Sequence, residues 1–425
     1  MHYVIIGAGP AGVIAADTLR KTDQTGGKIT LLGGEIALPY SRMAIPYFLS
    51  DAIDETGAYL RKGESYYARN DIDFRQARVL CIRPQDSMLA LEDGSTLSYD
   101  RLLIATGSQP VTPPIPGVDL PGIHHCWTLY DARQIRKLAK PGARVVLVGA
   151  GFIGCIIMEA LRERGAALTV LEREERILPR MMNGTGANLL KRWCIQKGVT
   201  VRTATSITGI EKKDAEQDSS GELIVHLETG AILTADLIVF AVGVRPNMDF
   251  LSGSGIETDD GILVNEYLQT SQPNIYAAGD VAQGADWSTG KRIVRAIQPT
   301  AAEHGRVSAC NMAGVPIRYP GSFDMNVLDT MGLVSVSMGQ SETGHDIATL
   351  LDWERYRYTR LAFEEDVLIG ALSIGGTQFS GVLRGLIQGK TRLGKWKQRL
   401  QADPSRVAEA YVACIRDMQL PQPSP

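Results

Sequence analysis

The sequence lacks the features that mark membrane-spanning, nucleic-acid-binding and metal-binding proteins. Its six cysteines are far apart and none belongs to a CxxC pair, which excludes an iron–sulfur or zinc site of the usual spacing and fits a cytoplasmic location. No apolar run reaches the ~18 residues of a membrane helix. The formal net charge of -3 argues against a general nucleic-acid or membrane binder. Because a strand pattern begins at residue 2, we expect no leader peptide.

Glycine, in contrast, is abundant, with 44 residues in a chain of 425, where a share of ~7% is usual. Glycine allows tight turns and lets the backbone approach a ligand closely. A chain of this length is too long for one hydrophobic core, so we expect two or three domains.

Many of the glycines fall in two copies of one motif, YVIIGAGPAG at residues 3–12 and VVLVGAGFIG at residues 145–154. Each copy is an apolar strand, a GxGxxG turn and a helix, followed by a second strand at residues 28–32 or 167–171. In this βαβ unit the first glycine permits the turn, the second lets backbone approach a pyrophosphate, and the third lets the helix pack on the strand. The phosphates then bind at the helix N-terminus. One such motif alone could be a plain glycine turn, but two complete units predict two bound dinucleotides.

An acidic residue after the second strand of such a unit binds the ribose diol. Glu172 follows the second unit directly, and its charge predicts a preference for NADH over NADPH. Arg173 beside it weakens that preference unless it is an ordinary surface charge. In the first unit the candidate is Glu35, which comes one or two residues late.

Further buried strands, at residues 101–107, 236–247 and 274–281, are expected to lead back to the first domain. We therefore predict an α/β protein with two Rossmann-like domains, one inserted in the other, and a carboxyl-terminal α+β domain. The predicted boundaries are 1–114 and 236–314 for the first dinucleotide-binding domain, 115–235 for the second, inserted one and 315–425 for the last domain. The polar stretch at residues 212–221 is expected to be a hairpin loop.

The motifs GAGPAG, ATG (105–107), GAGFIG, GVRPN (243–247) and AAGD (277–280) occur in this order. In this the chain resembles the two-dinucleotide-binding flavoproteins of the pyridine nucleotide-disulfide oxidoreductase family, including ferredoxin and rubredoxin reductases. The resemblance implies that the chain binds FAD and NAD(H). The expected FAD-binding residues are Gly7, Gly9, Pro10, Ala11, Gly12, Glu35, Arg42, Ala105, Thr106, Gly107, Gly279, Asp280, Pro299 and Thr300. The expected NAD-binding residues are Gly149, Gly151, Phe152, Ile153, Gly154, Glu172 and Gly243.

Several of these roles come from the resemblance. It implies that Asp280 bonds the ribityl or phosphate region of FAD, that Gly243 lines the nicotinamide pocket, and that Pro299-Thr300 lies near the flavin ring ahead of a helix at 301–311. A buried aspartate beside a helix N-terminus needs a partner in any case. The alternative for Asp280 is an ordinary helix N-cap.

The chain also departs from the family pattern. Met43 occupies the position of the redox cysteine of the oxidases and coenzyme A disulfide reductases, and a thioether forms neither a thiolate nor a disulfide. The Lys–Glu pair of the dioxygenase ferredoxin reductases is absent, with Tyr47 and Ile156 at those positions. We therefore expect no catalytic side chain and no metal site. Electrons are expected to leave the flavin directly for an external acceptor.

The carboxyl-terminal segment from Arg384 to Arg406 holds seven basic residues and one acidic residue, Asp403. It is either a solvated helix face or a docking surface for an acidic iron–sulfur protein or subunit. This tail resembles that of the NAD-reducing flavin subunits of tungsten aldehyde oxidoreductase and phenylglyoxylate dehydrogenase.

The favoured function is an FAD-dependent NADH:acceptor oxidoreductase, the flavin subunit of a larger iron–sulfur enzyme and oligomeric. One alternative is a free-standing NADH oxidase or a ferredoxin or rubredoxin reductase. Another is an FAD-binding signalling protein resembling apoptosis-inducing factor, against which the lack of a long insertion and of a strongly basic surface both argue.

Overall fold

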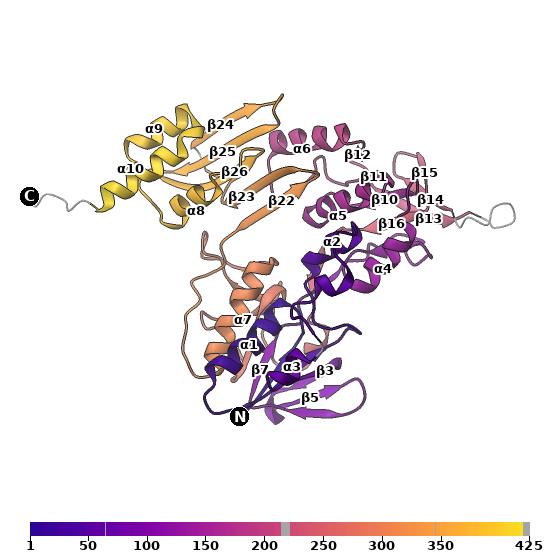
Figure 1. Cartoon of the computed structure of the whole chain (residues 1–425), viewed down its shortest axis with the longest axis vertical. Helices are drawn as coiled ribbons and strands as arrows, with labels where there is room; N and C mark the ends of the chain where they lie inside the picture. Colours follow the sequence, from indigo (N-terminus) through magenta and orange to yellow (C-terminus); the bar gives the residue numbers. More distant parts are fainter. Residues whose placement is uncertain (64, 214–221, 345, 420–425) are drawn as a thin grey trace, which may run out of the picture. The chain divides into compact units, whose positions relative to one another are not determined.

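The computed structural model describes residues 1–63, 65–213, 222–344 and 346–419. The chain divides into two compact units, coloured along the sequence in Figure 1. Unit 1 consists of Met1–Val111, Trp127–Ala132 and Val244–Ser322, and unit 2 of Thr112–Cys126, Arg133–Gly243 and Phe323–Pro425.

Unit 1 is built on a parallel five-stranded sheet. Its strands are β1 (His2–Ile6), β2 (Lys28–Gly33), β3 (Ile72–Gln76), β7 (Arg101–Ile104) and β19 (Ile275–Ala277). Their order is β19-β7-β1-β2-β3, and all four neighbouring pairs are parallel. Strand β1 is nearly all apolar because both faces of a parallel sheet are covered.

The remaining elements of unit 1 cover and extend this sheet. The helices are α1 (Pro10–Thr22), α2 (Ile45–Leu49), α3 (Tyr66–Arg69) and α7 (Gln298–Met312), with short 3-10 turns η1 (Arg42–Ala44), η2 (Glu55–Ala58), η3 (Pro84–Asp86), η4 (Asp249–Leu251) and η5 (Gly279–Val281). Helices α1 and α7 lie side by side, and a Cβ on Gly305 would lie only 2.2 Å from the carbonyl oxygen of Ala11. Three small sheets complete the unit: β4 (Val79–Arg83), β5 (Met88–Leu91) and β6 (Thr96–Ser98); β8 (Ser108–Pro110) and β17 (Val244–Pro246); β18 (Ile262–Leu263), β20 (Ala282–Ala285) and β21 (Arg292–Val294).

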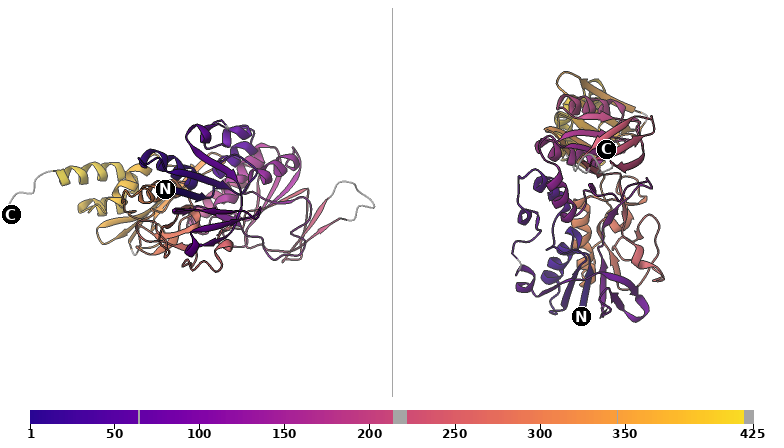
Figure 2. Two further views of the ribbon diagram at one scale, coloured as in Figure 1. Left: turned by 90° about the horizontal axis from the view of Figure 1, so that it is seen from below. Right: turned by 90° about the vertical axis from the view of Figure 1, so that its right-hand side faces the viewer.

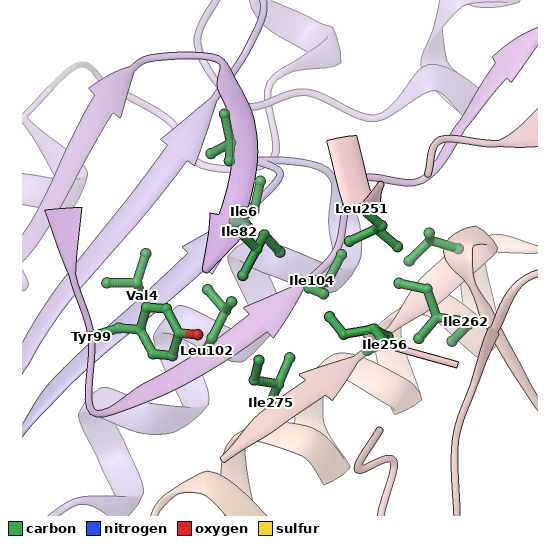
Figure 3. Close-up of a cluster of buried hydrophobic side chains, with 14 of the residues drawn as sticks. Val4, Ile6, Ile82, Tyr99, Leu102, Ile104, Leu251, Ile256, Ile262 and Ile275 are labelled. Atoms are coloured by element: carbon green, nitrogen blue, oxygen red, sulfur yellow. The ribbon is translucent and has the colours of Figure 1, made fainter. Parts of the chain in front are cut away.

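One of the hydrophobic clusters of unit 1 lies between the parallel sheet and the segments that follow β17. Figure 3 shows Ile104 of the sheet near Leu251, Ile256 and Ile262 of the later chain, and Val4 beside Tyr99. The sheet is therefore anchored by residues that are more than 200 positions apart in the sequence.

Unit 2 repeats the parallel sheet. Its strands are β9 (Ile123–His125), β10 (Arg144–Val148), β11 (Ala167–Leu171), β12 (Thr200–Arg202) and β16 (Leu237–Phe240), in the order β12-β11-β10-β16-β9, with helices α5 (Phe152–Glu163) and α6 (Gly184–Gln196). A three-stranded sheet follows, made of β13 (Ile207–Lys212), β14 (Leu223–Leu227) and β15 (Ile232–Ala235). Strands β13 and β14 pair antiparallel, and residues 214–221 of the expected hairpin loop lie outside the described residues.

The carboxyl-terminal part of unit 2 is an antiparallel sheet with helices on one side (Figures 1 and 2). The strands are β22 (Met325–Thr330), β23 (Leu333–Gly339), β24 (Asp346–Asp352), β25 (Arg357–Glu364) and β26 (Val367–Ile374), and the helices are α8 (Ser380–Gln388), α9 (Lys395–Ala402) and α10 (Val407–Gln419), with the turn η6 (Pro404–Arg406). The sheet packs on α6: Trp193 donates to the carbonyl of Thr330 at 3.0 Å, and Asn183 donates to the hydroxyl of Tyr358 at 2.8 Å.

Three assignments differ from those expected from the sequence. The segment Trp127–Ala132, expected in the NAD domain at 115–235, belongs to unit 1. Strand β16 was expected in the FAD domain from residue 236 onward, but it pairs with β10 in the second sheet. The sequences of β7 and β16 are alike because the two strands occupy equivalent positions in different sheets. Strand β7 pairs with β1 of unit 1, and β16 pairs with β10 of unit 2. The carboxyl-terminal segment, expected as a separate domain from residue 315, joins unit 2 from Phe323.

Candidate dinucleotide sites

The GxGxxG turn of unit 1 joins β1 to α1, and each glycine has a different environment. Gly7 has φ +110, and a Cβ there would lie 2.1 Å from the carbonyl oxygen of Ala105. A Cβ on Gly12 would lie 1.9 Å from the carbonyl oxygen of Gly7. A Cβ on Gly9 would meet no protein atom within 4 Å. Two glycines are therefore required by the fold, whereas the middle one borders open space at the N-terminus of α1.

The turn of unit 2, between β10 and α5, has the same pattern. Gly149 has φ +99, with a Cβ position 2.5 Å from the carbonyl oxygen of Ala241, and a Cβ on Gly154 would lie 2.0 Å from the carbonyl oxygen of Gly149. A Cβ on Gly151 would meet nothing within 4 Å. Phe152 and Ile153 form the first turn of α5, as Pro10 and Ala11 do in α1. Both turns thus leave room where a pyrophosphate could meet free backbone N–H groups.

Glu172 lies directly after β11 and is buried, with 8% of its surface exposed. Its carboxylate accepts the backbone N–H of Ala150 in the glycine turn at 2.7 Å and that of Glu174 at 2.9 Å. Arg173 points away: its side chain is 80% exposed and pairs with Glu174. The negative charge of Glu172 therefore stands at the glycine turn, and Arg173 is bonded elsewhere.

In unit 1 the position of Glu172 is taken by Gly33. The registers of the two sheets match, since Ile6 pairs with Leu32 as Val148 pairs with Leu171. Glu35 comes two residues later and is half-buried. Its carboxylate accepts from the Tyr40 hydroxyl at 2.6 Å and from the guanidinium of Arg42 at 2.8 Å. Unlike Glu172, this carboxylate has a cation beside it.

Asp280 lies in the three-residue turn η5, which is followed by strand β20, so no helix begins at Val281-Ala282 and the N-cap alternative is wrong. The turn does lie beside helix N-termini, because a Cβ on Gly279 would lie 3.3 Å from the Cβ of Ala11 in α1 and 3.5 Å from that of Ala301 in α7. Its carboxylate accepts the hydroxyl of Ser108 at 2.8 Å. Burial raises the pKa of Asp280, while the Ser108 hydrogen bond and the charge of Arg42 act in the opposite direction. Arg42, Ser108 and Asp280 are therefore close neighbours, as a common binding site requires.

Other expected FAD residues also lie in unit 1. The Thr106 hydroxyl donates to the carbonyl of Asn247 at 2.9 Å, and the Asn247 N–H donates to the carbonyl of Gly107 at 2.9 Å, so the ATG and GVRPN motifs are joined. Pro299 and Thr300 lie in the first turn of α7, not ahead of it, because the helix begins at Gln298. Gly243 belongs to unit 2, with φ +119 and no atom within 4 Å of its Cβ position.

The turn that carries Gly279 and Asp280 rests on His304 of α7. The N–H of Gly279 donates to Nδ1 of this histidine at 3.3 Å, and the ring packs edge-on against Tyr319 at a centroid distance of 4.6 Å. Burial lowers the pKa of His304 to about 4. The ring is therefore neutral at physiological pH, which allows Nδ1 to accept.

Sequence reasoning missed His304, Ser108, Tyr40 and Trp127. The Trp127 ring lies 4.9 Å from the guanidinium of Arg42, and its indole N–H donates to the carbonyl of Ser108 at 3.0 Å. No sequence motif marks these residues, because each acts through a contact with a distant part of the chain.

Met43, at the position where the resemblance implies a redox cysteine, is 45% exposed. Tyr47 is exposed as well. Cys155 follows the second glycine turn, but it is fully buried and burial raises its pKa well above the usual value. Burial also raises the pKa of Cys194 to about 12. Such thiols are poor nucleophiles.

Within the described part of the chain, no group of His, Cys, Asp and Glu residues has the arrangement of a metal site. Likewise, no described helix is long and apolar enough to cross a membrane. The open space at Gly9 and Gly151, the free helix N-termini and the buried carboxylates fit dinucleotides.

Comparison with known proteins decides the family. The family model of the pyridine nucleotide-disulphide oxidoreductases matches residues 1–304. The chain belongs to this family. It is 32% identical to the NADH-dependent phenylglyoxylate dehydrogenase subunit epsilon of Aromatoleum evansii over 417 residues, 97% of each chain. It is 28% identical to a rubredoxin-NAD(+) reductase of Pseudomonas putida, covering 91% of this chain and 99% of the relative.

Solved structures agree with this assignment. The covalent putidaredoxin reductase–putidaredoxin complex contains a chain that matches with a TM-score of 0.88 and 25% identity, covering 97% of this chain and 98% of that one. The predicted α/β architecture with Rossmann-like domains is confirmed. The protein is an NAD(H)-dependent oxidoreductase that binds FAD and transfers electrons between the two cofactors.

Proposed function

We propose that the chain is the flavin subunit of a larger iron–sulfur redox enzyme, with FAD in unit 1 and NAD(H) in unit 2. FAD held in unit 1 would supply the hydride exchange with the nicotinamide and the onward transfer of single electrons. The observation that carries this proposal is the thioether of Met43 at the position where the family resemblance implies a redox cysteine. With no thiol at that position, the electrons leave for an external acceptor.

The residues of unit 1 provide a binding surface with few reactive groups. Gly7, Gly9 and Gly12 shape the pyrophosphate cradle, and the side chain of Asp280, fixed by Ser108, offers acceptor oxygens to the hydroxyls of a ribityl chain. Arg42 offers a cation to phosphate. In unit 2 the Glu172 carboxylate offers two oxygens to a ribose diol and repels a 2′-phosphate. These residues bind and orient, and the cofactors supply the chemistry.

The nature of the partner is supported by the relatives. Their names include rubredoxin-NAD(+) reductase and the ferredoxin--NAD(+) reductase component of 3-phenylpropionate/cinnamic acid dioxygenase. The relative that matches over 97% of both chains is one subunit of a dehydrogenase. We propose likewise that this chain works in an oligomer and in the cytoplasm, a reducing compartment suited to its six cysteines, none of which forms a disulfide.

The candidate docking site in the basic segment 384–406 is smaller than its count of basic residues implies, because two of them form ion pairs within the chain. Lys397, expected to be part of it, is only 19% exposed and bonds Asp346 at 2.6 Å, and Arg406 pairs with Glu409. Arg392 and Lys395 are exposed and extend the surface near α9. Docking therefore concerns Arg392 and Lys395 more than Lys397, whose reversal would break a structural ion pair.

The test is electron delivery in the absence of oxygen. The purified protein is reduced with NADH, and its reoxidation by a purified ferredoxin or rubredoxin is followed by flavin absorbance. We expect reduction by NADH alone, reoxidation by the iron–sulfur protein, and no loss after thiol alkylation of the native protein. Fast oxygen consumption without any partner would instead favour a free-standing oxidase, and inhibition by alkylation would restore a cysteine mechanism.

Charge reversal tests the docking surface. Arg392→Glu with Lys395→Glu should slow reoxidation several-fold at 0.01 M salt and less at 0.1 M, since the Debye length falls from ~30 to ~10 Å. Lys137→Glu with Lys140→Glu, also exposed, serves as the matched control. Equal reoxidation rates for the two double variants at low salt would leave the basic segment an ordinary solvated surface.

A further inference from the structure

Trp127 contacts two parts of the proposed FAD site at once. Its carbonyl accepts Nη1 of Arg42 at 2.7 Å, and its ring lies 4.9 Å from the same guanidinium. Its indole N–H donates to the carbonyl of Ser108 at 3.0 Å, while the Ser108 hydroxyl donates to Asp280 at 2.8 Å. One side chain thus lies between the cation and the serine–aspartate pair.

The local sequence fixes Trp127 in this place. Helix α4 (Leu129–Leu138) begins with a capping box, in which the Thr128 hydroxyl accepts the Asp131 N–H at 3.1 Å and the Asp131 carboxylate accepts the Thr128 N–H at 2.8 Å. The same carboxylate accepts the N–H of Trp127 at 3.3 Å. The N–H of Leu129 donates to the Tyr40 hydroxyl at 3.2 Å. Trp127 is therefore held by backbone contacts that do not depend on its indole.

Arg42 has a long side chain that would otherwise lose much rotamer freedom on binding a ligand. Here Glu35 binds one side of its guanidinium, while the Trp127 carbonyl and ring bind another. The side chain is thus ordered by the protein itself, and ordering in advance lowers the entropic cost of binding. Of the two Trp127 contacts with Arg42, the ring is the one that a substitution at this position can remove.

We propose that Trp127 is a positioning residue of the FAD site, which holds Arg42 through its ring and the Ser108–Asp280 pair through its indole N–H. This inference rests on the proposed roles of Arg42 and Asp280 toward FAD. It assigns a role to a residue that lies outside every glycine motif.

Three variants separate the contacts. Trp127→Phe keeps a ring over Arg42 and loses the N–H to Ser108, whereas Trp127→Leu loses both. Tyr130→Leu, at an exposed position of the helix α4 that follows Trp127, is the control. FAD affinity is measured by titrating the flavin-free proteins, with the thermal midpoint of each recorded. We expect the Kd to rise about fivefold for Trp127→Phe and about thirtyfold for Trp127→Leu, with no change for Tyr130→Leu, from typical hydrogen-bond and cation–π strengths.

A double-mutant cycle with Arg42→Ala tests whether Trp127 acts through Arg42. In the Arg42→Ala background, Trp127→Leu should cost only about the fivefold of the lost N–H contact, not thirtyfold. The bound flavin spectrum should move in Trp127→Leu and return toward wild type in Trp127→Phe. Additive effects in the cycle, or an unchanged Kd in Trp127→Leu, would overturn the inference. If the wild-type protein itself bound no FAD, the proposed site of unit 1 would fail instead.

Discussion

The two glycine turns of the chain share a backbone and differ in the charge beside it. In both turns, a Cβ added to the first or third glycine would lie within 2.5 Å of a backbone carbonyl oxygen. A Cβ added to the middle glycine would meet no protein atom within 4 Å. In unit 2 the buried Glu172 bonds the N–H of Ala150. In unit 1 Gly33 takes that place, and Glu35, two residues on, is held by Arg42.

This difference shows which features of a dinucleotide site belong to the fold and which select the ligand. The backbone cradle is set by sterics and is the same in both units. We propose that selection depends on whether the carboxylate bonds only backbone N–H groups, as that of Glu172 does, or is paired with a cation, as that of Glu35 is with Arg42. An uncompensated carboxylate disfavours a second phosphate on the ribose.

The largest expected effect comes from the third glycine of either turn. Gly12→Val and Gly154→Val each place a Cβ at 2.0 Å or less from a backbone carbonyl oxygen, which cannot move without shifting the strand. We expect a loss of about 4 kcal/mol or more in the free energy of unfolding. Denaturant unfolding or soluble yield measures it. A variant as stable as wild type would show that the helix–strand contact is not needed.

The middle glycines should separate folding from binding. Gly9→Val and Gly151→Val introduce side chains where no protein atom lies within 4 Å, so both proteins should fold. Gly9→Val should lose bound FAD, while Gly151→Val should stay yellow and bind NADH at least tenfold more weakly. Flavin content and NADH titration measure the two effects. Full flavin retention in Gly9→Val would break the assignment of FAD to unit 1.

A pH titration sharpens the comparison, because the Asp280 turn of unit 1 rests on a neutral histidine. The pKa of His304 is about 4 in the folded protein, against 6.5 as the ordinary value. Between pH 6.5 and about 4, His304 is therefore protonated in the unfolded chain but neutral in the folded protein. The free energy of unfolding decreases as the pH falls through this range. The loss amounts to about 3 kcal/mol at ~1.4 kcal/mol per pKa unit.

Urea unfolding of the wild type and His304→Gln across this pH range measures that contribution. His304→Gln removes the titration and keeps an acceptor for the N–H of Gly279, so its stability should depend less on pH. Parallel curves for the two proteins would mean that His304 does not titrate as its burial implies.

The smallest effect concerns coenzyme choice at Glu172. Glu172→Gln removes the charge and keeps a side-chain oxygen that accepts a backbone N–H. Glu172→Ala would instead leave the N–H groups of Ala150 and Glu174 without this acceptor. We expect kcat/KM for NADH to fall about ten- to hundredfold and the preference over NADPH to shrink. Glu174→Gln is the exposed control. A wild type that used both coenzymes equally would refute this role of Glu172.

The sequence predicted the parts of the fold and site that depend on local backbone constraints. Positive φ at Gly7 and Gly149 and the close contacts of the third glycines leave no other residue possible, so the motif is visible in the chain. The sheet to which β16 belongs was not predictable, because a buried apolar strand has the same pattern in either domain. Trp127 and Ser108 also escaped detection, because their contacts join segments that are distant in sequence.

The most direct test of the central claim, FAD in the first turn and NAD(H) in the second, is an anaerobic titration of flavin absorbance with NADH. It is done on the wild type, Gly9→Val and Gly151→Val. The wild type should lose its flavin absorbance with one NADH per flavin, Gly9→Val should have no flavin to reduce, and Gly151→Val should keep its flavin but need far more NADH. If Gly151→Val lost the flavin and Gly9→Val kept it, the two assignments would be reversed. If both kept it and were reduced like the wild type, neither turn would bind a dinucleotide.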